Sequence, residues 1–319
     1  MKLFWTLFGV ATALAALVLL TAYISYRITF YSKRRSSAPT EEFTIPNGEI
    51  YEPFRDTMVR WMKEARAAHH EDLSIVSFDG LTLRGKYYEY QPGAPIELLL
   101  HGYRGSGERD LCGGIQRCFA LGRSALVVDQ RGCGQSEGHV ITFGINESRD
   151  CLSWVNFIID HFGKDVRIIL TGISMGAATV LMAGGMELPD NVVGILADCG
   201  YTSAREIIHK VIRQMKLPAR LLYPFVKLGA KLFGHFDLEE LSPLEAMKKC
   251  RVPVIFFHGE RDDFVPCEMS RINYDACTAP KKLLTVPNAG HGLSYLVDSE
   301  GYLNALTEFF SPVLNKQKK

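Results

Sequence analysis

A serine, a histidine and several carboxylates each follow a strand-like apolar run, and this combination suits nucleophilic chemistry on an acyl group. Ser174 stands in the segment GISMG at 172–176, between the apolar run Ile168–Leu170 and a helix-forming stretch that begins at Ala177. A G-x-S-x-G segment between a strand and a helix is typical of a sharp turn that lifts the serine hydroxyl above a sheet. The alternative is a glycine-rich turn with an idle serine. The strand-to-helix context favours a nucleophile at Ser174.

A serine hydroxyl is a weak nucleophile and needs a general base. His291 lies in the segment NAGHG at 288–292, after the last apolar run and before the C-terminal helix. A loop at that point can bring an imidazole to the serine, so His291 is the predicted base. Four other histidines compete with it: we expect two to brace turns at strand ends and two to lie in solvent before the sheet. His101 and His258 are the two at strand ends, and His69 and His70 are the two before the sheet.

The base in turn needs a carboxylate that fixes its tautomer and stabilises the imidazolium. Asp262 lies in the loop after the apolar run Val254–Phe257, with Glu260 and Asp263 as close alternatives. Asp198, at the end of the preceding run, is a fourth candidate. Asp262 heads these four candidates, and the residues alone leave the other three open. The order Ser, Asp, His along the chain is the one that this type of strand–turn–helix nucleophile uses.

Acyl transfer also needs donors for the oxyanion that forms on the substrate. One predicted donor is the backbone N–H of Met175, directly after the serine. The other is the backbone N–H of Tyr103, in the glycine-containing loop HGYRGS at 101–106 that follows the run Ile96–Leu100. A purely structural turn at 101–106 is the alternative, because glycine is favoured at many helix starts.

The rest of the chain alternates between strand and helix signals, which predicts an α/β fold with a mostly parallel central sheet flanked by helices. Asp79-Gly80 marks a hairpin between its two flanking strands, and apolar residues at helical spacing predict an amphipathic helix over 51–69. The predicted strands are Ser74–Phe78, Thr82–Tyr90, Ile96–Leu100, Ala125–Val128, Val166–Leu170, Val192–Ala197, Val252–Phe257 and Leu283–Val286.

The N-terminal run Leu3–Ile24 is almost wholly apolar and has the roughly 20 residues that a membrane-crossing helix needs. A cleavable signal peptide has a shorter apolar region, so we predict an uncleaved single-pass anchor. The basic residues that follow the run exceed those before it, which predicts that the C-terminal domain faces the cytoplasm. These residues are Arg27, Lys33, Arg34 and Arg35, against Lys2 alone. An extracytoplasmic domain on a signal anchor is the alternative.

The predicted organisation is therefore a transmembrane anchor over 1–26, a basic juxtamembrane linker over 27–46 and a catalytic domain over 47–315. Within this domain, an insertion at about 203–247 is too long for one crossover. Its stretch Ser203–Phe236 looks helical, broken at Pro218 and Pro224, and is predicted to cap the C-terminal edge of the sheet. Basic and leucine-rich positions interleave there. Either the cap has a solvated basic face, or this face lies on an anionic bilayer.

Composition excludes several classes of function. The formal net charge of +1 gives no global signal for nucleic acid, and the apolar content of 47% is that of a globular protein. The 8 cysteines form no C-x-x-C pair and no zinc-like spacing. We expect them to be buried free thiols, because a core of this size needs no disulfides.

Five segments together resemble the α/β-hydrolase superfamily: HGYRGS at 101–106, DQRGCGQSEG at 129–138, GISMG at 172–176, HGERDDFVP at 258–266 and NAGHG at 288–292. The sequence is similar to bacterial membrane-anchored hydrolases related to serine aminopeptidase-like and esterase/lipase proteins, over roughly residues 70 to 312. The family pattern H-G-x-x-D-x-x-V-P implies Asp262 as the acid. The resemblance also implies a structural turn at Arg131, braced by an ion pair, and neither a metal nor an organic cofactor.

Three functions remain open from the sequence. The first is hydrolysis of a carboxylic ester, with a small-molecule or lipid acyl substrate, through a Ser-His-Asp triad and an acyl-enzyme. The second is a peptidase or amidase with the same residues, for which no acidic group to hold a substrate amine stands out in the cap. The third is a non-catalytic membrane scaffold. An epoxide hydrolase or dehalogenase would need an aspartate in place of Ser174.

Overall fold

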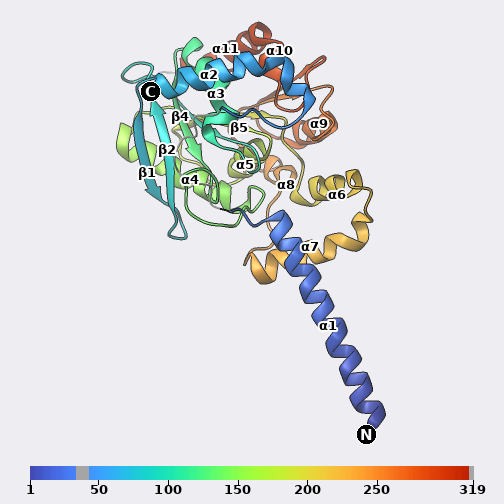
Figure 1. The fold of residues 1–319 in the computed structure, drawn as a ribbon. Helices are drawn as coiled ribbons and strands as arrows, with labels where there is room; N and C mark the ends of the chain where they lie inside the picture. The colour runs from blue at the N-terminus through green and yellow to red at the C-terminus, as the bar shows by residue number, and fades with distance from the viewer. Residues whose placement is uncertain (34–42, 316–319) are drawn as a thin grey trace.

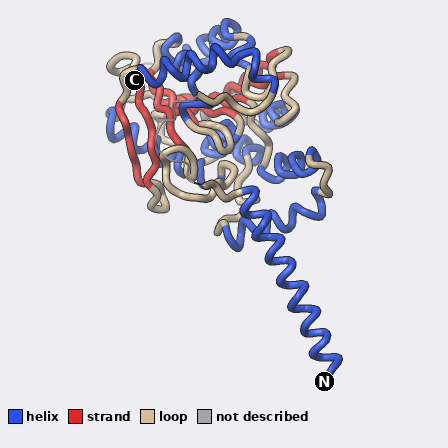
Figure 2. Tube along the Cα trace, viewed as in Figure 1, coloured by secondary structure: helices blue, strands red, loops and turns tan. Residues whose placement is uncertain are grey.

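The computed structural model describes residues 1–33 and 43–315, and in this part of the chain eight strands form one sheet, in the order β1-β2-β4-β3-β5-β6-β7-β8. Helices cover both of its faces (Figures 1 and 2). The strands are β1 Glu71–Val76, β2 Thr82–Tyr88, β3 Ile96–Leu100, β4 Ser124–Asp129, β5 Ile168–Ile173, β6 Val192–Asp198, β7 Val254–Gly259 and β8 Lys281–Val286.

The predicted α/β class is confirmed by the strand pairing. The pairs β1–β2 and β2–β4 are antiparallel, whereas every pair from β4 to β8 is parallel. Each predicted strand is present, but β1 lies earlier than the predicted Ser74–Phe78. Its end is set by Ser77, whose Oγ accepts from the Leu81 N–H at 2.8 Å and donates to Asp79 at 2.6 Å. These bonds place Ser77 and the residues after it in the hairpin turn.

The helices are distributed over two layers. On one face, α4 and α5 pack on the sheet through Trp154, Ile158 and Val180, and on the other face α3 and α11 pack through Ile115 and Phe310. The helices are α1 Lys2–Thr29, η1 Glu49–Phe54, α2 Arg55–Ala67, α3 Gly107–Ala120, α4 Ile145–Phe162, α5 Met175–Gly184, α6 Ala204–Gln214, α7 Ala219–Phe233, α8 Pro243–Met247, α9 Cys267–Ala276, α10 Ser294–Val297 and α11 Ser299–Leu314.

The region predicted as an amphipathic helix, 51–69, contains most of η1 and all of α2, which buries Met58, Met62 and Ala65. All 8 cysteines are free, and only Cys267 among them is not fully buried. Arg131 braces its turn as the resemblance implies, with 2.6 Å bonds to Asp150 and contacts to Asp79.

The segment 203–247 contains α6, α7 and α8, and its helices break at only one of the two predicted prolines. Pro218 separates α6 from α7, whereas Pro224 lies inside α7, so the predicted second break is wrong. A proline near the start of a helix removes one backbone hydrogen bond. The buried side chains Tyr223 and Val226 hold α7 in place on either side of it.

The N-terminal helix α1 extends away from the sheet and is longer than the predicted anchor over 1–26 (Figure 1). Among the residues that the structure describes, it is the one helix long and apolar enough to cross a membrane. Its last turns pack on the domain, and Ala22 and Phe30 are fully buried. Part of the predicted linker 27–46 therefore belongs to the fold, while its residues 34–42, including Arg34 and Arg35, lie outside the described residues.

A buried ion cluster supports the strand that leads to the loop 101–106. Glu97, on β3, accepts from Arg117 at 2.5 Å and from Arg123 at 2.6 Å, and its side chain is fully buried. Burial raises the pKa of Glu97, but the two guanidinium groups outweigh this effect and lower it to about 2. Glu97 is thus ionised and holds two buried cations in place.

This cluster predicts a large loss of stability on removal of its anion. Glu97→Gln leaves Arg117 and Arg123 buried without a counter-charge, and breaking such a buried pair costs about 3–5 kcal/mol. Chemical denaturation of the purified protein, with the exposed Glu187→Gln as the matched control, measures this loss. A Glu97→Gln protein as stable as the control would show that the cluster does not stabilise the fold.

Candidate active site

Ser174 occupies a strained turn between β5 and α5. Its φ of 57° and ψ of −117° lie outside the regions that side-chain-bearing residues ordinarily adopt. Two glycines make the turn sterically feasible: a Cβ on Gly172 would lie 2.1 Å from the Gly176 carbonyl oxygen, and one on Gly176 would lie 2.1 Å from that of Leu100. The turn is therefore the predicted nucleophile elbow in its geometry, with the hydroxyl above the C-terminal edge of the sheet.

His291 bridges Ser174 and Asp262. Its Nε2 lies 2.9 Å from Ser174 Oγ, and its Nδ1 lies 2.7 Å from Asp262 Oδ2. In the neutral imidazole that fits both bonds, Nδ1–H donates to the carboxylate and Nε2 accepts from the hydroxyl. The loop that carries His291 is held by Tyr51 of η1, whose hydroxyl donates to the His291 carbonyl at 2.9 Å. Three segments far apart in sequence thus converge on one array.

The carboxylates of Asp198 and Glu260 accept hydrogen bonds elsewhere, and the side chain of Asp263 is exposed. Asp198 accepts from Ser294 Oγ at 3.1 Å and from the Tyr302 hydroxyl at 3.0 Å. Glu260 accepts from Thr285 Oγ1 at 2.7 Å. The main chain of Asp263 accepts from α6 through Lys210 and Gln214. The geometry therefore favours Asp262 among the four carboxylates.

A second histidine contacts the same carboxylate, and the sequence did not reveal this role. His258 Nε2 lies 3.2 Å from Asp262 Oδ2 and 2.8 Å from the Val265 carbonyl, while its Nδ1 is 2.6 Å from Ser270 Oγ. His258 therefore braces the turn as expected and also orients the acid. Its position four residues before Asp262 in the motif was the available signal. The competitor His101 braces the adjacent loop, with its ring between Gly102 and Gln130.

Asp262 is ionised in this setting. Burial raises the pKa of its carboxyl, but hydrogen bonds from His258 and His291 outweigh the burial and lower the pKa to about 2. The other carboxylate oxygen accepts the backbone N–H groups of Phe264 and Val265, at 3.0 and 2.8 Å. A buried, ionised and fully bonded carboxylate is suited to stabilise an imidazolium.

The two predicted oxyanion donors belong to two segments next to the serine. Met175 is the first residue of α5, where the backbone N–H has no acceptor within its own helix. The loop 101–106 touches the serine, since a Cβ on Gly102 would lie 3.6 Å from Ser174 Cβ. This loop is fastened by Asp110, which accepts from the Gly102 N–H at 3.2 Å. Tyr103 follows directly, with its side chain directed to the end of α1.

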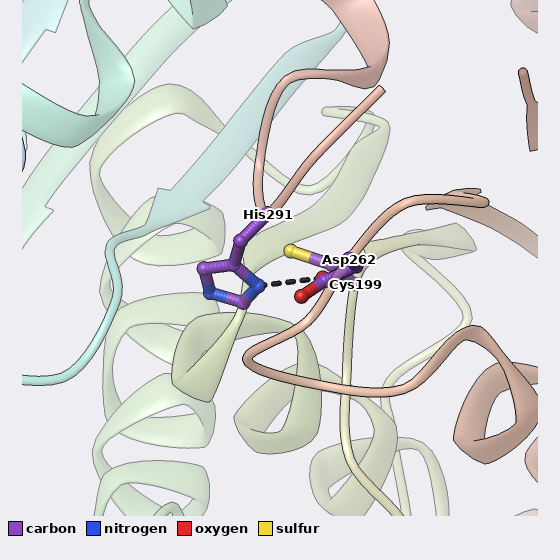
Figure 3. Close-up of side chains that lie close together, drawn as sticks. All are labelled: Cys199, Asp262 and His291. Atoms are coloured by element: carbon purple, nitrogen blue, oxygen red, sulfur yellow. Dashed lines mark hydrogen bonds and ion pairs between the residues drawn. The ribbon is translucent and has the colours of Figure 1, made fainter. Parts of the chain in front are cut away.

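Cys199 joins Asp262 and His291 in a cluster whose potential ligand atoms lie within 4.8 Å of one another (Figure 3). A metal site there would need a thiolate and free carboxylate oxygens. Burial, together with the charges of Asp198 and Asp262, raises the pKa of the Cys199 thiol well above its ordinary value. Both oxygens of Asp262 already accept hydrogen bonds. The donor set therefore fits a hydrogen-bonded acid and base better than a metal.

A model of the α/β hydrolase fold matches residues 98–232, which contain the loop 101–106 and the turn at Ser174. The chain has the α/β-hydrolase fold. Among solved structures, it is similar to the esterase Pf2001 of Pyrococcus furiosus, with a TM-score of 0.66, 22% identity, and coverage of 85% of this chain and 97% of that one. At this identity, the likeness supports the fold.

Two bacterial relatives share sequence with this α/β-hydrolase-fold chain. Protein YqkD of Bacillus subtilis (strain 168) is 30% identical over 190 residues, which cover 59% of this chain and 62% of that protein. Protein Rv2307c of Mycobacterium tuberculosis (strain H37Rv) is 26% identical over 244 residues, which cover 75% of this chain and 79% of that protein. The match to YqkD thus spans less than two thirds of its length.

The lowered pKa of Asp262 predicts a pH-dependent contribution to stability. A carboxyl with a depressed pKa in the folded state stabilises the fold above its unfolded pKa of about 3.9, and this stability is lost as the pH falls toward the folded value. The folded value here is about 2. The Asp262→Asn protein lacks this charge. Its stability should therefore fall furthest below that of wild type above about pH 5.

The measurement is the denaturation midpoint of both proteins from pH 3 to pH 7. The gap between wild type and Asp262→Asn should be constant near neutrality and shrink by about half at pH 3. A gap that stays constant over the whole range would contradict an ionised Asp262 with a depressed pKa.

Proposed function

We propose that the chain is a serine hydrolase that cleaves carboxylic esters through Ser174, His291 and Asp262. The observation that carries the proposal is the pair of bonds on one imidazole: Nε2 at 2.9 Å from the serine oxygen and Nδ1 at 2.7 Å from the carboxylate. A base in hydrogen-bond reach of a nucleophile, and oriented by a third group, is the arrangement that nucleophilic acyl transfer requires. The elbow geometry at Ser174 holds the largely buried hydroxyl within reach of that base.

The proposed reaction has two halves. In the first, Ser174 Oγ attacks the acyl carbon while His291 Nε2 takes the hydroxyl proton; the carbon–alkoxide bond then breaks and the imidazolium returns this proton to the departing alcohol. In the second, His291 takes a proton from water, the resulting hydroxide attacks the acyl-serine, and Ser174 leaves with the proton. Asp262 stays ionised throughout and stabilises the imidazolium.

The oxyanion of each half-reaction is proposed to lie between the backbone N–H groups of Met175 and Tyr103. Both belong to segments that contact the serine, one as the first residue of α5 and one in the loop beside Gly102. Pre-oriented donors of this kind stabilise charge only where it develops, so each contributes more to the transition state than to substrate binding.

We also propose that α1 anchors the enzyme in a membrane, with the catalytic domain on the cytoplasmic side. The threonines of α1 support insertion, because the hydroxyls of Thr6, Thr12 and Thr21 donate to carbonyls one turn earlier and leave no unpaired donor in lipid. A removable signal sequence is disfavoured by burial of Ala22 in the domain, since cleavage after the run Leu3–Ile24 would remove this core residue.

The substrate class follows from these two features together. A domain held at a membrane by its own helix meets acyl esters of lipids more often than it meets peptides, and the residues around the elbow include Phe143, Tyr103 and Val265. Purified protein should hydrolyse acyl p-nitrophenyl esters and leave aminoacyl p-nitroanilides intact. Turnover of the anilides in preference to the esters would instead identify a peptidase or amidase.

Loss of the nucleophile should abolish turnover without unfolding the protein. Ser174→Ala removes one oxygen and adds no atom to the turn, so stability should hold while ester turnover falls on the order of a millionfold. Ester hydrolysis and the denaturation midpoint are measured on the same preparation. Residual activity close to wild type would show that another group attacks the ester.

Loss of the acid should discriminate among the four carboxylates. Asp262→Asn is expected to lower turnover about ten-thousandfold, because the amide favours the wrong tautomer of His291. Asp263→Asn is the matched control, since its side chain is exposed and only its main chain contacts α6. Near-normal activity in Asp262→Asn together with an inactive Asp198→Asn would reassign the acid.

A further inference from the structure

Helix α7 has an apolar side that the protein does not cover. Its core side carries Ala219, Tyr223, Val226 and Ala230, all buried. The opposite side carries a second apolar row at helical spacing, which we call the outer stripe: Leu221, Phe225, Leu228 and Leu232. Leu221 is 64% exposed and Leu232 is 42% exposed. A soluble surface helix has one apolar face, so the outer stripe needs another partner.

The position of α1 identifies this partner. Every residue of α1 up to Leu20 is exposed, and this length of helix rises about 30 Å, the thickness of the hydrocarbon core. The next residues pack on α7: a Cβ on Gly229 would lie 2.4 Å from the Ala22 carbonyl oxygen, and the Tyr23 ring is 5.2 Å from that of Phe233. The two helices cross beside the domain (Figure 1). Helix α7 thus meets α1 where the lipid-spanning length ends.

Charge on α7 matches a lipid surface as well. Arg220 and Lys231 lie on one side of the outer stripe and are exposed. The α6–α7 turn adds Lys216 and the apolar side chains Met215 and Leu217, 61% and 43% exposed. An interfacial helix buries its apolar face by about 5–10 Å and presents cations to anionic headgroups. The aromatic residues Trp5 and Tyr23 mark the two ends of the span in the manner of interfacial belts.

We propose that the outer stripe of α7 lies in the interface of an anionic bilayer, next to the point where α1 enters it. The cap segment is then a second membrane contact, and the domain is held in a fixed orientation by two helices that cross. Helix α6 contacts the main chain of Asp263 through Lys210 and Gln214. The membrane contact of the cap segment therefore places the loop that carries Asp262 near the lipid surface.

The test uses the full-length protein in nanodiscs that contain phosphatidylglycerol. Nitroxide labels are attached at Leu221→Cys and Leu232→Cys in a Cys267→Ser background, because the other native cysteines are buried. Val76→Cys on β1, where the side chain is 71% exposed, is the control. Collision with oxygen, which concentrates in lipid, is compared with collision with a water-soluble nickel chelate.

Labels at 221 and 232 should collide mainly with oxygen and the label at 76 mainly with nickel. Arg220→Gln with Lys231→Gln should shift the 221 label toward nickel in anionic discs and leave it unchanged in phosphatidylcholine discs. Labels at 221 and 232 that behave like the label at 76 would overturn the proposal. Protection from both reagents with spin–spin broadening would assign the outer stripe to a second copy of the chain and would overturn it equally.

A separate set of contacts joins α1 to the loop beside Ser174. The Tyr103 hydroxyl donates to the Thr29 carbonyl at 2.8 Å, and Arg104 donates to the carbonyls of Ile28 and Tyr31 at 2.8 and 3.0 Å. The last carbonyls of a helix have no partners within it and carry partial negative charge, so a guanidinium is a suitable partner. Arg104 itself has a φ of 53°, a backbone conformation that needs such support.

We infer that the end of α1 positions the oxyanion donor of the proposed hydrolase. The backbone N–H of Tyr103 lies between Gly102, which touches Ser174, and the two side chains that are fastened to α1. Tyr103 and Arg104 are positioning residues in this scheme, since their side chains act through the main chain of the loop. The inference rests on the proposed function, because only an active enzyme reveals it.

Tyr103→Phe combined with Arg104→Met should lower kcat for an acyl ester by roughly tenfold to a hundredfold with little change in KM, because the donor is displaced. Affinity for a boronic acid, which forms an anionic adduct with the serine, should fall in parallel. Arg104→Lys in place of Arg104→Met in the double variant should restore part of the rate. The exposed Arg213→Met is the control. An unchanged kcat in the double variant overturns the inference; an inactive wild type would instead overturn the proposed function.

Discussion

The strained backbone at Ser174 is the constraint on which the site depends. A non-glycine residue with a φ of 57° costs on the order of 1–3 kcal/mol, and it persists only where the surroundings fix it. The close approaches at Gly172 and Gly176 leave no room for a side chain at either position between β5 and α5. Once the serine is fixed there, the imidazole of His291 has one place from which Nε2 can reach it.

The loops after β7 and β8 supply that place together. The Arg261 N–H donates to the Ala289 carbonyl at 3.0 Å, so the loop with the acid holds the loop with the base. Within the first loop, Asp262 is shared between His258 and His291, while backbone donors fill its other oxygen. The array is therefore built by main-chain contacts of the sheet edge as much as by the three side chains.

Much of this could be predicted from sequence, because the apolar runs and the glycine-flanked serine carry local signals. The convergence of Ser174 and His291 followed from the order of the motifs and the rule that parallel strands end at one edge. The choice of Asp262 over its neighbours needed the resemblance to a family pattern. The contact of His258 with Asp262 had only one signal, its place four residues earlier in the motif, and it forms only when the turn at 259–265 closes. The predicted helix break at Pro224 was wrong because packing around Tyr223 outweighs one missing hydrogen bond.

The end of α1 shows a different limit of prediction. Ala22, Tyr26 and Phe30 are buried at a helical spacing, but they lie at the end of, or just after, an apolar run in which nearly every residue is compatible with lipid. Without a contrast between polar and apolar positions, the sequence does not show which side of the helix meets protein. Only the packing against α7 reveals that the end of α1 is part of the domain.

The most direct measurement is the site of covalent modification by a fluorophosphonate, mapped by tandem mass spectrometry on the folded full-length protein. Attack by an activated serine predicts a single phosphonylated peptide, modified at Ser174, and loss of this adduct in His291→Ala. An unmodified native protein, or an adduct at another residue that persists without His291, would contradict a nucleophile at Ser174 activated by that histidine.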